Sequence, residues 1–165
     1  MVTKIGILVM NGPNLNLLGE RDPTVYGVQT LDEINGYIKT SLRGVELRFA
    51  EIGIDVSISA SFYQSNHEGA LIDCLQEARK VYDGVVFNPG AYTHYSYALH
   101  DAIESIDIPV VEVHLSDISA REEFRRTSVT APACIGQVKG LGRKGYVDAI
   151  EMLVANITAD GGDSI

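Results

Sequence analysis

Cysteine is scarce in this sequence, with only Cys74 and Cys134 among 165 residues. The two lie far apart and form no Cys-x-x-Cys motif, so we expect reduced side chains in apolar surroundings rather than a disulfide or a redox pair. Long apolar runs are missing too, and the first residues lack the basic segment and cleavable apolar stretch of a signal peptide. These absences predict a cytoplasmic protein without a membrane partner.

Positive charge is also in short supply, because 13 lysines and arginines face 22 aspartates and glutamates and leave a net charge of −9. Such a field repels nucleic acid and anionic membranes, whereas a small anionic substrate stays compatible where arginines gather locally. Apolar residues make up 45% and charged residues 21%, as in an ordinary globular protein. We expect one catalytic domain at residues 1–158 and a frayed, polar tail at residues 159–165.

Two common kinds of binding motif are absent from the sequence. No glycine-rich phosphate loop of the Walker or dinucleotide-binding type follows a predicted strand. The histidines are scattered and lack the spacing of metal ligands; they are His67, His94, His100 and His114. We therefore expect neither a cofactor nor a metal ion.

Strand-like and helix-like segments alternate along the chain. Strands are expected at Ile5–Asn11, Asp55–Phe62, Gly84–Asn88, Pro109–Leu115 and Ala133–Val138. Helices are expected from Thr30, which opens a capping box with Glu33, to about Leu47, and at Glu68–Lys80, Thr93–Ser105 and Gly145–Ile157. Alternation of this kind predicts an α/β, flavodoxin-like, doubly wound sheet of five parallel strands in the order 2-1-3-4-5.

The fourth predicted strand delivers polar residues to its carboxyl end, in the segment Val110-Val-Glu-Val-His-Leu-Ser116. Alternation along a strand points Glu112 and His114 to the same face, where the carboxylate can orient the imidazole or stabilise its protonated form. The backbone N–H groups of Leu115 and Ser116 are candidates for an anion cradle. Ligands of open α/β sheets bind at this end of the strands, so we expect the site there.

The long segment between the first strand and the first helix contains a second candidate group, the pair Arg21 and Tyr26. Free tyrosine ionises near pH 10, and a close arginine stabilises the phenolate because guanidinium does not lose its charge. Glycines flank the segment, as expected of a closing lid. The alternative, a surface turn in which Tyr26 merely packs down, stays open from this segment alone.

Further polar residues follow the other strand ends. Asn14 and Asn88 offer amides, and His94 and Arg125 are suited to hydroxyl or carboxylate groups. Each of them, taken singly, also fits a structural role, as a turn residue or a surface ion pair. Asp101 follows on the predicted helix, and Arg121 is assigned to a solvated, salt-bridged turn.

A base and an imidazole acid without a cofactor suit proton abstraction beside a carbonyl followed by loss of a hydroxyl. The alternative is a non-catalytic flavodoxin-like binding or receiver module. A receiver needs an acidic phosphate acceptor after the third strand, where this chain has Asn88. A flavin binder needs a serine- and threonine-rich loop after the first strand, where this chain has Asn11-Gly-Pro-Asn14.

Several long motifs, in order from about residue 5 to 155, together resemble type II 3-dehydroquinate dehydratase. They are Asn11-Gly-Pro-Asn-Leu-Asn-Leu-Leu-Gly19, Arg21-Asp-Pro-Thr-Val-Tyr-Gly27, Gln64-Ser-Asn-His-Glu-Gly69, Asn88-Pro-Gly-Ala-Tyr-Thr-His94, Glu112-Val-His-Leu-Ser116 and Ala120-Arg-Glu-Glu-Phe-Arg125. The sequence departs from the family pattern at Asp117 and Ser119, and at Tyr95, Tyr97 and His100.

The resemblance implies a shikimate-pathway hydro-lyase that converts 3-dehydroquinate to 3-dehydroshikimate and water, with quinate breakdown as the alternative context. It implies that Tyr26 removes the proton, Arg21 keeps Tyr26 anionic, Asn14 helps to hold an enolate through water, and His114, oriented by Glu112, protonates the leaving hydroxyl. The remaining residues would bind substrate: Asn88, Leu115 and Ser116 its carboxylate region, and His94, Arg125 and a neighbouring subunit's Asp101 its hydroxyls. A dodecamer built of trimers is implied as well.

Overall fold

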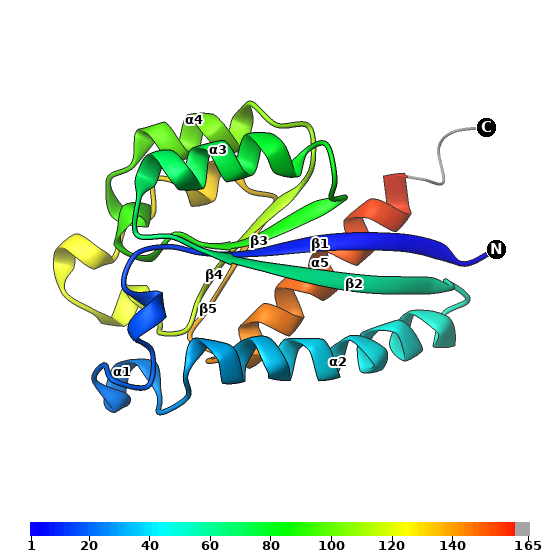
Figure 1. Cartoon of the computed structure of the whole chain (residues 1–165), viewed down its shortest axis with the longest axis horizontal. Coiled ribbons are helices and arrows are strands. Elements are labelled where there is room, and N and C mark those ends of the chain that lie inside the picture. The colour runs from blue at the N-terminus through cyan, green and yellow to red at the C-terminus, as the bar shows by residue number, and fades with distance from the viewer. Residues whose placement is uncertain (161–165) are drawn as a thin grey trace.

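The structure is a computed structural model that describes residues 1–160. Its core is a sheet of parallel strands in the order β2-β1-β3-β4-β5 (Figure 1). The strands are β1 (Thr3–Asn11), β2 (Val56–Gln64), β3 (Gly84–Asn88), β4 (Val110–His114) and β5 (Gly136–Lys139). The predicted α/β class and strand order are therefore confirmed.

Two pairs of helices cover the sheet, one pair on each face (Figure 1). They are α2 (Leu31–Glu51) with α5 (Lys144–Asp160), and α3 (Glu68–Ala78) with α4 (Tyr97–Glu104). Alternate residues of β1 serve the two faces, because Ile7 and Val9 pack in the core under α2 and α5, whereas Leu8 and Met10 pack in the other core. None of the helices within residues 1–160 has the length and apolar composition needed to cross a bilayer.

The α2 helix begins where the sequence predicts. The Thr30 hydroxyl accepts a hydrogen bond from the Glu33 N–H at 3.2 Å, and the Glu33 carboxylate accepts one from the Thr30 N–H at 2.8 Å. This capping box satisfies two N–H groups that a helix start leaves unpaired. At the other end of the chain α5 extends to Asp160, and the rest of the tail that we expect to be frayed, residues 161–165, lies outside the described residues.

The helix expected over Thr93–Ser105 is divided in two. A 3₁₀ turn spans Gly90–His94, and α4 starts only at Tyr97. Ser96 stands between them with extended backbone angles, and its hydroxyl accepts a hydrogen bond from the Leu99 N–H at 3.0 Å. The prediction overlooked this serine as a helix cap, although serine is among the preferred residues for that position.

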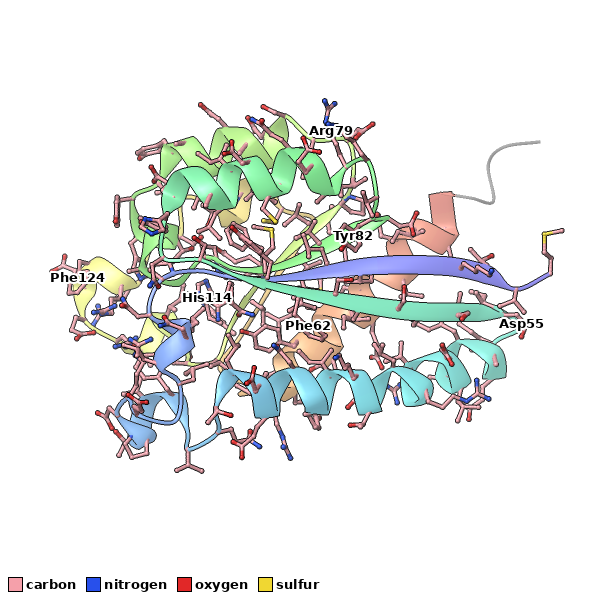
Figure 2. All side chains as sticks on the ribbon, in the orientation of Figure 1. Asp55, Phe62, Arg79, Tyr82, His114 and Phe124 are labelled. Carbon is pink, nitrogen blue, oxygen red and sulfur yellow. The ribbon has the colours of Figure 1, made fainter. Side chains whose placement is uncertain are left out.

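The loops that follow β1 and β3 lie against each other. The Gly12 N–H donates to the Asn88 carbonyl at 2.7 Å, and a Cβ atom on Gly12 would lie only 2.5 Å from the Pro89 carbonyl oxygen. Glycine thus permits a backbone approach that no larger residue allows. The short helix α1 (Pro23–Tyr26) and the labelled residues His114 and Phe124 lie at this end of the molecule, opposite Asp55 (Figures 1 and 2).

Candidate active site

A cavity of about 110 Å³ lies at the carboxyl ends of β1, β3 and β4. Most of the candidate residues line it, namely Asn14, Arg21, Tyr26, Asn88, His94, His114, Leu115, Ser116 and Arg125. The lining also includes Arg121 but no aspartate or glutamate. A chain with a net charge of −9 therefore presents a locally cationic cavity, which suits an anionic ligand.

On one side of the cavity is the pair His114 and Glu112, both buried on β4. The His114 Nε2 atom lies 3.4 Å from the Glu112 Oε1 atom, so the carboxylate stabilises the protonated imidazole. Burial alone would raise the pKa of Glu112, but the contact with His114 and hydrogen bonds from the Thr130 and Thr93 hydroxyls outweigh burial and lower this pKa to about 2. Glu112 is consequently an anion at any physiological pH.

On another side of the cavity is Tyr26, at the end of α1. The Arg21 guanidinium lies over the tyrosine ring, with its central carbon 3.7 Å from the ring centroid. The phenol oxygen is instead bound by Arg121, whose Nη1 atom donates to it at 2.9 Å. The assignment of Arg121 to a solvated turn is therefore wrong: the 3₁₀ turn Ile118–Ala120 carries this arginine back to the cavity, where only 19% of its side chain is exposed.

The amides of Asn14, in the loop after β1, and of Asn88, at the end of β3, line the cavity. Asn14 has a left-handed backbone with φ of 66°, a conformation that asparagine tolerates better than most residues. The Asn88 Oδ1 atom accepts from the Gly90 N–H at 3.1 Å, and its Nδ2 atom donates to the buried Tyr146 hydroxyl at 3.1 Å. These two bonds fix the orientation of the Asn88 amide, and its second N–H remains for a ligand.

His94 is held in one tautomer. Its Nδ1 atom lies 2.8 Å from the Thr127 carbonyl oxygen, so Nδ1 carries the proton and Nε2 is left as an acceptor. Burial lowers the pKa of His94, and the neighbouring His114 and Arg125 lower it further, against the opposing effects of the Thr127 hydrogen bond and Glu112. A neutral imidazole at this position can accept a hydrogen bond from a ligand hydroxyl.

Two candidate residues do not line the cavity. Glu112 lies behind His114, as expected of a group that orients the imidazole. Asp101 is exposed on α4, where it forms with His100 and Glu104 the one group of potential metal ligands found within residues 1–160. That group lies outside the cavity.

The sequence reasoning missed the residues that support the candidates. Tyr146 bridges two asparagines, because its hydroxyl donates to the Asn11 Oδ1 atom at 2.6 Å and accepts from Asn88. The hydrogen-bond partners of Glu112 were missed as well; they are Thr93, Ser128, Thr130 and Gln137. The buried polar residues come from separate segments, so sequence spacing gives no sign that they meet.

The sequence is similar to those of known proteins over most of its length. A sequence model of the family described as dehydroquinase class II matches residues 5–154. The chain is 57% identical to the 3-dehydroquinate dehydratase of Bacillus pumilus, over 90% of this chain and 93% of that protein. It is 51% identical to the 3-dehydroquinate dehydratase of Bacillus subtilis, over 95% of this chain and 97% of that protein.

Solved structures give the same result for the fold. The crystal structure of the type II dehydroquinase from Butyrivibrio crossotus matches with a TM-score of 0.76 and 47% identity, and covers 92% of this chain and 98% of that one. The type II dehydroquinase from Propionibacterium acnes matches with a TM-score of 0.75 and 36% identity, over 96% of this chain and 99% of that one.

Proposed function

The chain belongs to the class II dehydroquinase family, and from that membership we propose that its cavity converts 3-dehydroquinate to 3-dehydroshikimate and water. The observation that carries the proposal is that Tyr26, with Arg121 on its oxygen, lines the same cavity as His114. One side supplies a base and the other an acid, as an elimination requires. Family membership decides against the flavin-binding and receiver alternatives.

In the proposed first step the Tyr26 phenolate takes a proton from the carbon beside the ketone, and the electron pair moves onto the ketone oxygen as an enolate. Arg121 donates to the phenolate oxygen, and Arg21 lies over the ring, so both cations favour the anionic base. Asn14 supplies an amide to the enolate, through a water molecule. Hydrogen bonds and cations stabilise a developing negative charge more effectively in a cavity that partly excludes water than in bulk solvent.

In the second step the enolate returns to a ketone, a carbon–carbon double bond forms, and the tertiary hydroxyl leaves. His114 gives its proton to that hydroxyl, which departs as water, and Glu112 stabilises the imidazolium until then. The proton held by Tyr26 returns to His114 through solvent, so the enzyme ends as it began.

Substrate placement follows from the remaining lining residues. The free N–H of Asn88, with Leu115 and Ser116, is assigned to the substrate carboxylate, and the cationic cavity favours that charge. His94, through Nε2, and Arg125 are assigned to the ring hydroxyls.

We place the enzyme in the cytoplasm as a dodecamer built of trimers. Asp101 supports an oligomer, because it is exposed and absent from the cavity of its own chain, as expected of a residue that serves a neighbouring subunit. Light scattering after size exclusion measures the assembly. A monomer with full activity would contradict this assignment.

The function is tested with Tyr26→Phe and His114→Ala in an ultraviolet assay for the conjugated enone product. Each change removes a proton-transfer group, so turnover should fall by about 10²–10⁴. Near-normal turnover in both variants would refute the assignment.

A lysine Schiff base offers a different route to the same product. No lysine lines the cavity, so borohydride added with substrate should leave the enzyme active. Inactivation with covalent labelling of a lysine would contradict the acid–base scheme.

A further inference from the structure

Glu112 is surrounded by neutral hydrogen-bond donors. Hydroxyl groups of Thr93 and Thr130 donate to its Oε1 atom. The Ser128 hydroxyl lies 2.9 Å from Oε2 and 3.1 Å from Oε1, and the Gln137 amide donates to Oε2 at 2.8 Å. We call these four residues the Glu112 cage.

The cage is assembled from three separate parts of the fold. Thr93 comes from the 3₁₀ turn after β3, Ser128 and Thr130 from the segment before β5, and Gln137 from β5, where it pairs in register with Glu112. The four cage donors by themselves match the roughly four lone-pair positions of a carboxylate. A buried anion needs such partners. The number of donors to Glu112 also affects how strongly Glu112 attracts the His114 imidazolium.

Hydrogen bonds from neutral donors spread the negative charge of a carboxylate and place the positive ends of their dipoles beside it. A carboxylate shared in this way attracts an adjacent imidazolium less strongly than an unshared one. The His114 Nε2 atom lies 3.4 Å from Glu112, longer than the cage contacts, and has no partner with hydrogen-bond geometry. Glu112 thus orients the imidazole while most of its bonding capacity is taken by the cage.

We propose that the Glu112 cage sets how tightly Glu112 holds the proton of His114, so that Thr93, Ser128, Thr130 and Gln137 are positioning residues for the acid of the elimination. The inference rests on the proposed role of His114. A cage with one donor fewer leaves more charge on the carboxylate, holds the imidazolium proton more tightly and makes His114 a weaker acid.

The other ionisable groups around this pair are the same residues in every cage variant. Those that share the cavity with His114 are Arg21, Tyr26, His94, Arg121 and Arg125. On the Glu112 side is Cys134, a neutral thiol because burial and the charge of Glu112 raise its pKa to about 12. Lys139 pairs with His114 along the strand ladder but its side chain is exposed.

The test compares Thr130→Val, which keeps the side-chain shape, and Gln137→Leu, which replaces the amide by an apolar side chain, with Thr130→Ser, which keeps the hydroxyl. Each of the first two removes one donor. Gln76→Leu on the exposed face of α3 is the matched control. The pH profile of kcat is measured on the intact protein, and the imidazole of His114 is followed in parallel by histidine NMR, with unfolding by urea as a record of stability.

We expect the alkaline limb of kcat and the His114 NMR titration to move to higher pH by about half a unit or more in Thr130→Val and Gln137→Leu. We expect kcat at neutral pH to fall several-fold in both, because a weaker acid transfers its proton more slowly. Thr130→Ser and Gln76→Leu should keep the parental profile.

Loss of stability without movement of either titration would assign the cage a structural role alone and overturn the inference. Movement of the alkaline limb of kcat or of the His114 NMR titration to lower pH would overturn the inference as well. Should Thr130→Val not fold, Gln137→Leu on the edge strand gives the same measurement. An inactive parental protein would contradict the proposed function instead, and the NMR titration would still decide the effect of the cage.

Discussion

Arg121 is the residue whose replacement tests the proposed base most directly. Its Nη1 atom lies 2.9 Å from the Tyr26 oxygen, and its side chain is largely buried. Two unit charges about 4 Å apart interact by about 4 kcal/mol at an effective dielectric constant of about 20. We take about half of that energy, about 2 kcal/mol, because Tyr26 is partly exposed and solvent screens the pair.

The Arg121→Met variant keeps the length of the side chain and loses its charge. A loss of about 2 kcal/mol in phenolate stabilisation corresponds to about a thirty-fold fall in kcat/KM at neutral pH. The acid limb of the pH profile should move to higher pH, because Arg121→Met removes the cation that donates to the Tyr26 oxygen. Arg121→Lys retains the charge but lacks the planar donor set of arginine, so its kcat/KM should lie between those of the parental protein and Arg121→Met.

The measurement is the initial rate of enone formation across the pH range, with Arg43→Met as the control. Arg43 is an arginine whose side chain is 74% exposed, and its loss should leave the profile unchanged. Parental kcat/KM and an unmoved acid limb in Arg121→Met would refute the argument that this cation holds the phenolate.

Three further predictions concern stability. The pKa of Glu112 falls from 4.5 to about 2 on folding, so this carboxylate stabilises the protein above about pH 4.5, and the contribution is lost as the pH falls toward 2. Acid unfolding followed by circular dichroism should begin in that pH window. The Glu112→Gln variant should lack this pH dependence of stability. Tyr146→Phe leaves the Asn88 amide with a buried unpaired N–H, and the free energy of unfolding measured with urea should fall by about 1–3 kcal/mol. The same variant should have a higher KM. An unchanged KM would contradict the role given to Asn88. Gly12→Ala places a methyl group against Pro89 and should destabilise the protein by about 1–3 kcal/mol; a thermal midpoint equal to the parent's would show that these loops separate easily.

The fold could be predicted because its determinants are local. The Thr30 and Glu33 capping box is contained in four consecutive residues, and the apolar strands are bounded by turn residues. Helix ends were less accurate, since α2 continues to Glu51, beyond the expected Leu47, and Ser96 divides the helix expected from Thr93. These ends depend on which side chain satisfies the terminal backbone groups, and that is decided after the chain has folded.

The candidate site could be predicted in part, for a related reason. Strand ends converge in a parallel sheet, so Asn14, Asn88 and His114 could be expected to meet. The position of Arg121 depends on a 3₁₀ turn in a long connection, and the contacts of Gln137 depend on strand register. Neither has a local sequence pattern, so neither could be foreseen.

The distribution of charge explains how an acidic protein can handle an anionic substrate. Three arginines line the cavity, and no carboxylate does. Glu112, the carboxylate in contact with His114, is buried behind that imidazole with neutral donors around it, so its charge acts on the imidazole and much less on the ligand. In the proposed scheme a carboxylate placed in the cavity would repel the substrate, and one without donors would hold the proton of His114 too tightly. The position and the partners of Glu112 meet both requirements at once.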